Sequence, residues 1–487
     1  MNTRLIKTCV MHSVAFVILS SLYGCASPSY QSQAMEQLTV PEHWQSAHQL
    51  DSSTSAKDNT SWLATLNDDQ LSELVLLALA NNRQLQAKLA TLKIAEQQAI
   101  VSGAAKFPEL SLSQGNGRKK LVKDNGVQYQ TSADINLTLS YELDVWGKLS
   151  DQQHQAKLDL LAAQNTYLQA KQQLTADVAK SWFNLIEAQQ LLALYQKRAD
   201  NLSNNLAMIQ SSYRLGLTDA LDVYLTQNNV NSELARVASQ QQQVLASKRA
   251  LELLIGEYPQ ASINAKQRLP EINNHIATGL PAQLLTQRAD LVASWYQLLV
   301  LDAGVAIAHK QRFPRFALTT SAGDSSDQLS ELLSGNTIAW SLLGNITMPL
   351  FSGGKLAAQE QQAKLKLVQK EQLYLEQLFQ AFAEVENTVD NHASLTQRYR
   401  YLLEAQENAK QAEKLSFDQY LRGLVQYTTV LESQRRSFDA QTSVIHLKNQ
   451  LLQNRIDIHL ALGGDFVTAE DELEPKLAVS SMTLISE

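Results

Sequence analysis

The residues that most often carry out chemistry do not form the spacings that catalytic or metal sites require. The nine His residues show no His-x-x-x-His or other tight ligand spacing, which argues against a metal centre. Gly353-Gly354-Lys355 lacks the Gly-x-x-x-x-Gly-Lys-Ser/Thr pattern of a phosphate-binding loop. Carboxylates are plentiful, but no pocket signal pairs two of them as acid and base. The sequence therefore predicts no catalytic residue, no metal and no cofactor, and an enzyme is the least supported class.

Cys25 is the one residue whose surroundings predict a chemical modification. A charged start precedes an apolar run from Val10 to Leu22, which is typical of a secretory signal and too short for a spanning helix. The run closes on Leu22-Tyr23-Gly24-Cys25, which is similar to a bacterial lipobox ending at a lipidated Cys25. Ala26 then favours sorting to the outer membrane; an ordinary signal cleaved elsewhere is the alternative. Cys9 leaves with the signal, so one mature chain has no partner for a disulfide.

The composition favours long helices and argues against nucleic acid as a partner. The net charge is -7, only 18% of residues are charged, and no basic stripe is present. Few Pro and Gly among many Ala, Leu and Gln are typical of extended helical structure.

The chain repeats itself. Gly147-Lys148-Leu149 recurs as Gly354-Lys355-Leu356, Gly216-Leu217 as Gly423-Leu424, and Gly256 as Gly463, each pair 207 residues apart. A constant offset over more than a hundred positions indicates a duplication, which has to be recognised before the fold is assigned. We expect a signal peptide (1–24), a lipid-anchored tether (25–61), a first structural repeat (62–258), a linker (259–281), a second repeat (282–464) and an acidic tail (465–487).

Each repeat contributes two predicted strands. Along Tyr129–Leu143 apolar and polar residues alternate for fifteen positions, longer than the ~5–6 residues of an ordinary strand and long enough for the ~9–11 of a membrane barrel strand. Its predicted partner is Glu109–Ser113, with 115–126 as a loop, and the second repeat supplies Arg315–Gly323 and Thr337–Leu350. Four strands cannot close a membrane barrel, so other protomers must complete it; two copies or three would both serve.

Two helical hairpins follow the strands. Nothing breaks a helix from Leu149 to Leu215, and 67 residues at ~1.5 Å each reach roughly 100 Å. Apolar residues from Leu185 to Tyr213 recur at steps of three and four, which predicts a coiled-coil seam. Leu215-Gly216-Leu217-Thr218-Asp219 predicts a tight reversal, with Thr218 and Asp219 capping the next helix. The second hairpin is predicted to turn at Arg422-Gly423-Leu424.

These motifs resemble the TolC-type outer-membrane factors, in particular the NodT-like lipoproteins of resistance–nodulation–division efflux pumps. The resemblance covers Trp62 to Gly464 and is strongest at 141–148 (YELDVWGK), 349–355 (PLFSGGK) and the two tips. It implies an α+β membrane protein: a homotrimer with a twelve-strand outer-membrane β-barrel, four strands per protomer, continuous with a periplasmic tunnel of α-helical coiled-coil hairpins. It also implies a periplasmic membrane-fusion adaptor and an inner-membrane pump as partners.

The resemblance also suggests functional residues. The tips implied to dock the adaptor are Tyr213, Gly216, Leu217, Tyr420, Gly423 and Leu424. A tunnel gate is implied at Asp222, six residues after the first tip glycine, and at Glu432, nine after the second. Thr429 and Val425 stand where relatives carry an acidic residue and a linking arginine. The alternative is that Asp222 and Glu432 are ordinary solvated carboxylates.

Three functions are compatible with these features. The first is a passive exit duct for small molecules such as drugs and toxic compounds. The second keeps the channel but assigns it to type I protein secretion. The third is a lipid-anchored coiled-coil scaffold without a pore, against which the alternation at Tyr129–Leu143 argues.

Overall fold

The structure of the protein is a computed structural model that describes residues 40–46, 62–63, 66, 68–123, 126–265, 268–271, 281, 284–327, 332 and 338–464. Cys25, its signal and the acidic tail lie outside these residues. The described chain divides into two compact units. The sheet unit holds residues 92–163 and 293–375, and the bundle unit holds residues 40–91, 164–292 and 376–464.

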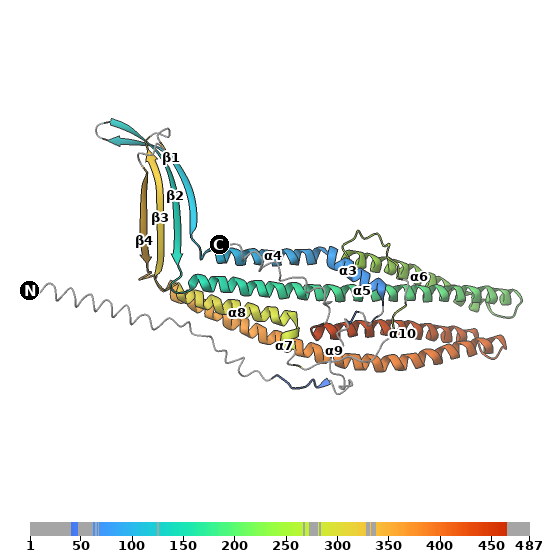
Figure 1. Cartoon of the computed structure of the whole chain (residues 1–487). Helices are drawn as coiled ribbons and strands as arrows, with labels where there is room; N and C mark the ends of the chain where they lie inside the picture. Colours follow the sequence, from blue (N-terminus) through green and yellow to red (C-terminus); the bar gives the residue numbers. More distant parts are fainter. Residues whose placement is uncertain are drawn as a thin grey trace, which may run out of the picture. The chain divides into compact units, whose positions relative to one another are not determined.

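The element order repeats a pattern of helix, two strands and a helical hairpin (Figure 1). The first half comprises α3 (Asp69–Asn81), α4 (Arg83–Ala104), β1 (Glu109–Lys123), β2 (Gly126–Leu143), α5 (Lys148–Arg214) and α6 (Ala220–Leu254). The second comprises α7 (Leu284–Gln287), α8 (Ala289–Lys310), β3 (Arg315–Ser326), β4 (Ala339–Thr347), α9 (Lys355–Leu421) and α10 (Tyr427–Ala461).

Local signals explain where the first helices begin and end. Asp68 caps α3, because its Oδ1 accepts a hydrogen bond from the backbone N–H of Leu71 at 3.0 Å. Asn82 ends α3 and caps α4 in the same way, accepting from the N–H of Leu85 at 2.9 Å. Asn82 therefore divides this helical stretch into α3 and α4.

In the sheet unit, four antiparallel strands pair in the order β1-β2-β3-β4. The prediction of a loop over 115–126 is wrong, because β1 pairs with β2 as far as Lys123 opposite Gly126. Regular pairing satisfies the backbone groups of this stretch, although its Gly, Asn and Lys residues are poor strand formers on their own. The predicted fourth strand, 337–350, is shorter in the structure, where β4 spans Ala339–Thr347.

The bundle unit buries its core where α3 crosses the long helices. Trp182 of α5 is fully buried there, and its Nε1 donates to Oδ2 of Asp68 at 2.8 Å. The predicted seam of α5 is buried at most of its positions, including Leu185, Leu202 and Ile209. The coiled-coil interpretation of this helix is therefore confirmed.

One helix among the described residues has the length and composition to cross a membrane. It is α8, whose most apolar window has a mean hydropathy of 1.6 and is 39% buried. In the sheet unit, Leu298 of α8 packs with Leu367 and Tyr374 of α9. These contacts are those of a core helix, so α8 carries no argument for a helical membrane span.

Candidate functional site

The two faces of the sheet differ sharply in chemistry. Because side chains alternate along each strand, the register assigns every residue to one of two faces. The apolar face carries Leu110, Leu112, Ile135, Leu137, Leu139, Tyr141, Leu143, Phe316, Leu318, Trp340, Leu342 and Ile346. The polar face carries Ser111, Ser113, Asn136, Thr138, Ser140, Thr319, Ser321, Ser341, Asn345 and Thr347. Leu343 is a large apolar residue on the polar face.

The apolar face is open in the single chain. Trp340 is 78% exposed and Leu112 69% exposed, and Ile346 is exposed to the same degree. A soluble protein rarely exposes so large a contiguous apolar patch, and such a patch marks a surface meant for lipid or a partner. The strands β1 and β4 also leave two unpaired edges, which hydrocarbon does not tolerate.

The junction of sheet and helix explains the 141–148 motif. Asp144 caps α5, accepting from the N–H groups of Leu149 and Ser150 at 2.8 Å each. Trp146 Nε1 donates to the carbonyl of Pro314 at 2.7 Å, which ties the first repeat to the start of β3. The motif residues are therefore structural in this chain, fixing how two strands pass into helices.

The two hairpin tips share one backbone geometry. At the first, the N–H of Leu217 donates to the carbonyl of Ser212 at 2.9 Å, and that of Gly216 to Tyr213 at 2.9 Å. At the second, the corresponding bond from Leu424 to Gln419 is also 2.9 Å. This is the Schellman pattern, which needs a left-handed residue after the helix. The tip glycines supply it, with φ of 72° and 71°.

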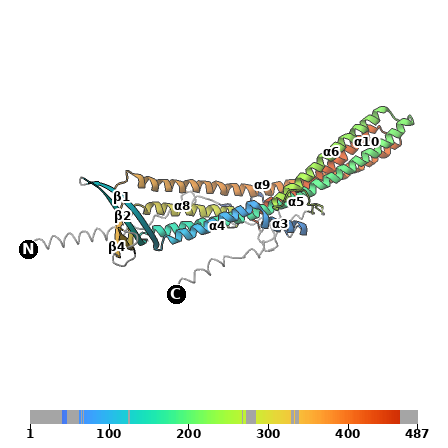
Figure 2. The same cartoon turned by 90° about the horizontal axis from the view of Figure 1, so that it is seen from above.

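The tips expose apolar side chains at their ends and bury a cluster just behind them. Leu217 is 75% exposed and Leu424 69% exposed, while Tyr213 is about half exposed. Figure 2 shows the two hairpins ending together in the bundle unit. Behind the ends, one buried cluster draws on all four helices: Ile209, Val223, Phe417, Tyr420, Tyr427, Val430 and Leu431.

The structure gives the two candidate gate residues different surroundings. Asp222 accepts a hydrogen bond from the Thr218 hydroxyl at 2.5 Å. Burial raises the pKa of Tyr420, and the charge of nearby Asp222 raises it further. Asp219 occupies the N-cap position of α6 without a side-chain cap, so the predicted capping by Thr218 and Asp219 is wrong in detail. Thr218 instead holds the carboxylate of Asp222.

Glu432 lies on α10 beside two arginines of the same helix. Its carboxylate pairs with Arg435 at 2.9 Å and with Arg436 at 2.7 Å. Hydrogen bonds from these arginines lower the pKa of Glu432 to about 2. Within the described residues no ion pair joins Asp222 to Glu432. The negative charge of Glu432 is locally offset, whereas among the residues that the structure describes no cation pairs with Asp222.

A docked N-terminal segment was not predicted from the sequence. Within the stretch interpreted as a tether, Trp44 is 3% exposed and its ring lies 6.0 Å from that of Phe382. The N–H groups of Gln45 and Ser46 each donate to the Glu386 carboxylate at 2.9 Å. The sequence feature that indicates docking is Trp44, a large aromatic residue in an otherwise polar stretch.

No group of three or more His, Cys, Asp or Glu side chains suited to a metal ion occurs in the described part of the chain.

The sequence profile of a family described as outer membrane efflux protein matches residues 74–257 and 280–464. The chain belongs to the outer membrane efflux protein family. The predicted family resemblance, outer-membrane localisation and efflux role are thereby confirmed.

Individual relatives cover nearly the whole chain. The chain is 29% identical to the probable outer membrane lipoprotein SilC of Salmonella typhimurium, over 92% of this chain and 97% of that protein. It is 29% identical to the solvent efflux pump outer membrane protein SrpC of Pseudomonas putida, over 83% and 87% respectively.

Solved structures show the same fold. A membrane protein from Pseudomonas aeruginosa superposes with a TM-score of 0.80 at 27% identity, covering 89% of this chain and 99% of that one. The CmeC outer membrane channel of Campylobacter jejuni superposes with a TM-score of 0.80 at 21% identity, covering 92% and 98%. The four-stranded sheet with long helical hairpins is therefore the fold of known outer-membrane channels.

Proposed function

We propose that the protein is the outer-membrane exit duct of a tripartite efflux pump, and that it exports small molecules passively. The observation that supports this most directly is the two-faced sheet with two open edges. Three copies give twelve strands, with β1 of one copy beside β4 of the next. The barrel then has an apolar exterior and a polar lumen.

The dimensions of the apolar face fit a bilayer. From Ile135 to Leu143 the face runs over nine residues of β2, and the eight steps between them cover ~27 Å at ~3.4 Å each. A strand tilted by ~40° then covers roughly 20 Å of depth, close to the ~25 Å apolar band of outer-membrane barrels. Lipidation at Cys25 supplies a second attachment to the membrane.

The exposed leucines at the tips support a docking role. Leu217 and Leu424 lie on rigid turns and stay uncovered in the single chain. We propose that a periplasmic membrane-fusion adaptor covers them, together with Tyr213 and Tyr420, and connects the duct to an inner-membrane resistance–nodulation–division pump. Asp222 is proposed as the gate residue, with Glu432 contributing less because two arginines offset its charge.

We propose that the chain is organised as a signal peptide (1–24), a tether (25–61), two structural repeats (62–258 and 282–464) joined by a linker, and a tail (465–487). Within the tether, residues 40–46 are docked against α9. Relatives are named for cation efflux and for solvent efflux, so we propose small molecules as the cargo class. No observation favours protein secretion or a pore-less scaffold over this reading.

Mass measurement tests the proposal. Purified, lipidated protein in detergent should form a particle of three chains, and that particle should give discrete conductance steps in planar bilayers. A stable single chain that inserts into no membrane would contradict the exit-duct proposal. It would favour a lipid-anchored coiled-coil scaffold instead.

A further inference from the structure

The β1–β2 hairpin continues beyond the rest of the sheet. Pairing of β2 with β3 ends at Ala133 opposite Ser326, whereas β1 and β2 stay paired as far as Lys123 opposite Gly126. Figure 1 shows this two-stranded ribbon bending sideways above the upper ends of β3 and β4. The ribbon carries the most concentrated run of positive charge in the sheet, Arg118-Lys119-Lys120.

The register divides these three cations between the two faces. Arg118 and Lys120 share their side of β1 with Leu110 and Leu112, so they lie on the apolar face. Lys119 lies on the polar face. All three side chains are exposed. Arg118 and Lys120 thus lie on the side of the ribbon that continues the apolar face, and Lys119 lies on the other side.

Their height places the two cations at the edge of the apolar band. Ile135 ends the continuous run of large aliphatic residues on this face of β2, and Arg118 pairs with Thr131, four residues further out. Val122 and Val127 pair beyond the cations, at the end of the ribbon. Four residues of strand span ~14 Å, less after tilt. This is the level of lipid headgroups rather than of bulk water.

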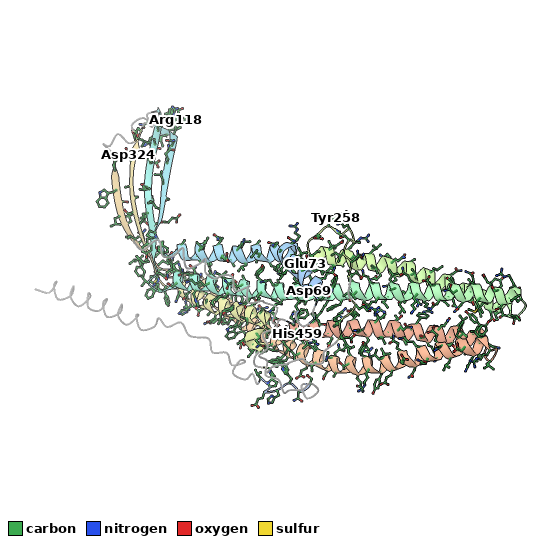
Figure 3. The ribbon with its side chains drawn as sticks, turned by 45° about the vertical axis from the view of Figure 1, so that its right-hand side comes forward. Asp69, Glu73, Arg118, Tyr258, Asp324 and His459 are labelled. Carbon is green, nitrogen blue, oxygen red and sulfur yellow. The ribbon has the colours of Figure 1, made fainter. Side chains whose placement is uncertain are left out.

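The topology also fixes which headgroups these are. β1 begins at Glu109 after α4, and β2 ends at Leu143 before α5, both at the end opposite Arg118. Figure 3 shows Arg118 at that far end of the sheet. Because the helices extend into the periplasm, the hairpin end faces the outer leaflet.

An aromatic ring holds one of the cations. The guanidinium carbon of Arg118 lies 4.9 Å from the ring centroid of Tyr129, which is on the same face and 57% exposed. Stacking on the ring orients the planar guanidinium group of Arg118 and leaves its N–H groups at the edge of the plane. A guanidinium group can bind a phosphate there through two parallel hydrogen bonds. Asp324, the acidic residue on this face of β3, is 3% exposed and makes contacts of its own.

We infer that Arg118, Lys120 and Tyr129 form an outward-facing site for the phosphorylated headgroup of an outer-leaflet glycolipid. This inference rests on the proposed function, since it needs the sheet to lie in the outer membrane. The site gives the duct a fixed vertical position: the apolar face takes the acyl chains and the two cations take the phosphates.

Lipid binding to the purified, lipidated complex tests the site, with bisphosphorylated lipid A as the probe and native mass spectrometry as the readout. Each cation near a charged lipid surface strengthens binding roughly fivefold, so Arg118→Ala with Lys120→Ala should weaken it about thirtyfold. Lys119→Ala, the matched control on the opposite face, should change it less than about twofold. Arg118→Lys should recover part of the loss.

Three outcomes would overturn the site. They are equal weakening by Lys119→Ala, equal binding of dephosphorylated lipid A, and displacement of lipid A by an equal concentration of inorganic phosphate. The last would mean a simple phosphate site. Single-channel conductance of the same samples separates the two proposals. Normal conductance without a preference for lipid A would contradict the lipid site alone. Absent conductance would contradict the exit-duct proposal.

Discussion

The two repeats agree in their helices and disagree in their strands. Both long helices have 67 residues and both return helices have 35, and all four of their boundaries are related by the same offset of 207. The strands of the first repeat have 15 and 18 residues, those of the second 12 and 9. A helical tunnel made of two hairpins needs equal lengths, whereas strands that end outside the membrane are free to vary.

The same offset pairs residues of unlike chemistry. Asp222 corresponds to Thr429, and buried Glu252 corresponds to partly buried His459. The repeats thus keep a common backbone while dividing tasks between them. Substitutions at equivalent positions show which tasks are shared and which belong to one repeat.

The largest effect is expected at the tips. Proline at Gly216 or Gly423 cannot adopt the φ of about 70° found there and loses the turn's N–H bond. Either variant should reduce pump-dependent export more than tenfold, measured as efflux from cells, with the three-chain particle intact. Gly216→Asn is the control, because asparagine tolerates this conformation. Loss of the particle together with export would remove the docking role.

The gate is expected to be asymmetric. Asp222→Ala removes a charge that Thr218 orients beside Tyr420, and should raise single-channel conductance severalfold if three such charges close the tip. Glu432→Ala should raise it less, because Arg435 and Arg436 already offset that charge. Equal conductance in wild type and Asp222→Ala would make Asp222 an ordinary surface carboxylate.

Acid should weaken the two repeats in different pH ranges. Burial lowers the pKa of His459 to about 4. The contribution of neutral His459 to folding stability is therefore complete above pH 6.5. It is lost as the pH falls towards 4, by up to about 3 kcal/mol. Burial opposes ionisation of Glu252, but hydrogen bonds from Ala261 and Ser262 lower its pKa overall. Its contribution is therefore lost only below about pH 4.5.

Thermal melting followed by circular dichroism checks this assignment. His459→Phe keeps an aromatic ring against Trp62 and should reduce the pH dependence between 6.5 and 4.5. Burial also lowers the pKa of His392, which keeps part of that dependence. Glu252→Gln should leave the pH dependence of the melting temperature unchanged between 6.5 and 4.5. A His459→Phe curve parallel to wild type would contradict the assignment.

The smallest effect is expected at the docked N-terminal segment, which has no counterpart on α5. Glu386→Gln removes the charge that holds Gln45 and Ser46, worth about 1 kcal/mol, so cleavage near Trp44 by a protease should quicken roughly fivefold. Glu376→Gln, exposed on the same helix, is the control. Equal cleavage of both variants would mean that Glu386 does not hold the segment.

Sequence periodicity predicted the elements well where one rule dominated. The alternation at Tyr129–Leu143 and the seam of α5 each reflect burial on one face, which any local window records. The extension of β1 to Lys123 was missed because pairing with β2 overrides the weak strand preference of its residues. The docked Trp44 and the arginine partners of Glu432 depend on contacts that no spacing records.

Trp340 is the best-placed residue for testing whether the apolar face of the sheet meets lipid. Trp340 is 78% exposed on that face, while Trp44, Trp62 and Trp182 are at most 3% exposed. In vesicles of lipids brominated on their acyl chains, wild-type fluorescence should be quenched more than that of Trp340→Phe. Adding Leu343→Trp to Trp340→Phe, on the polar face, should restore emission without quenching. Equal fractional quenching of wild type and Trp340→Phe would mean that the apolar face does not meet lipid.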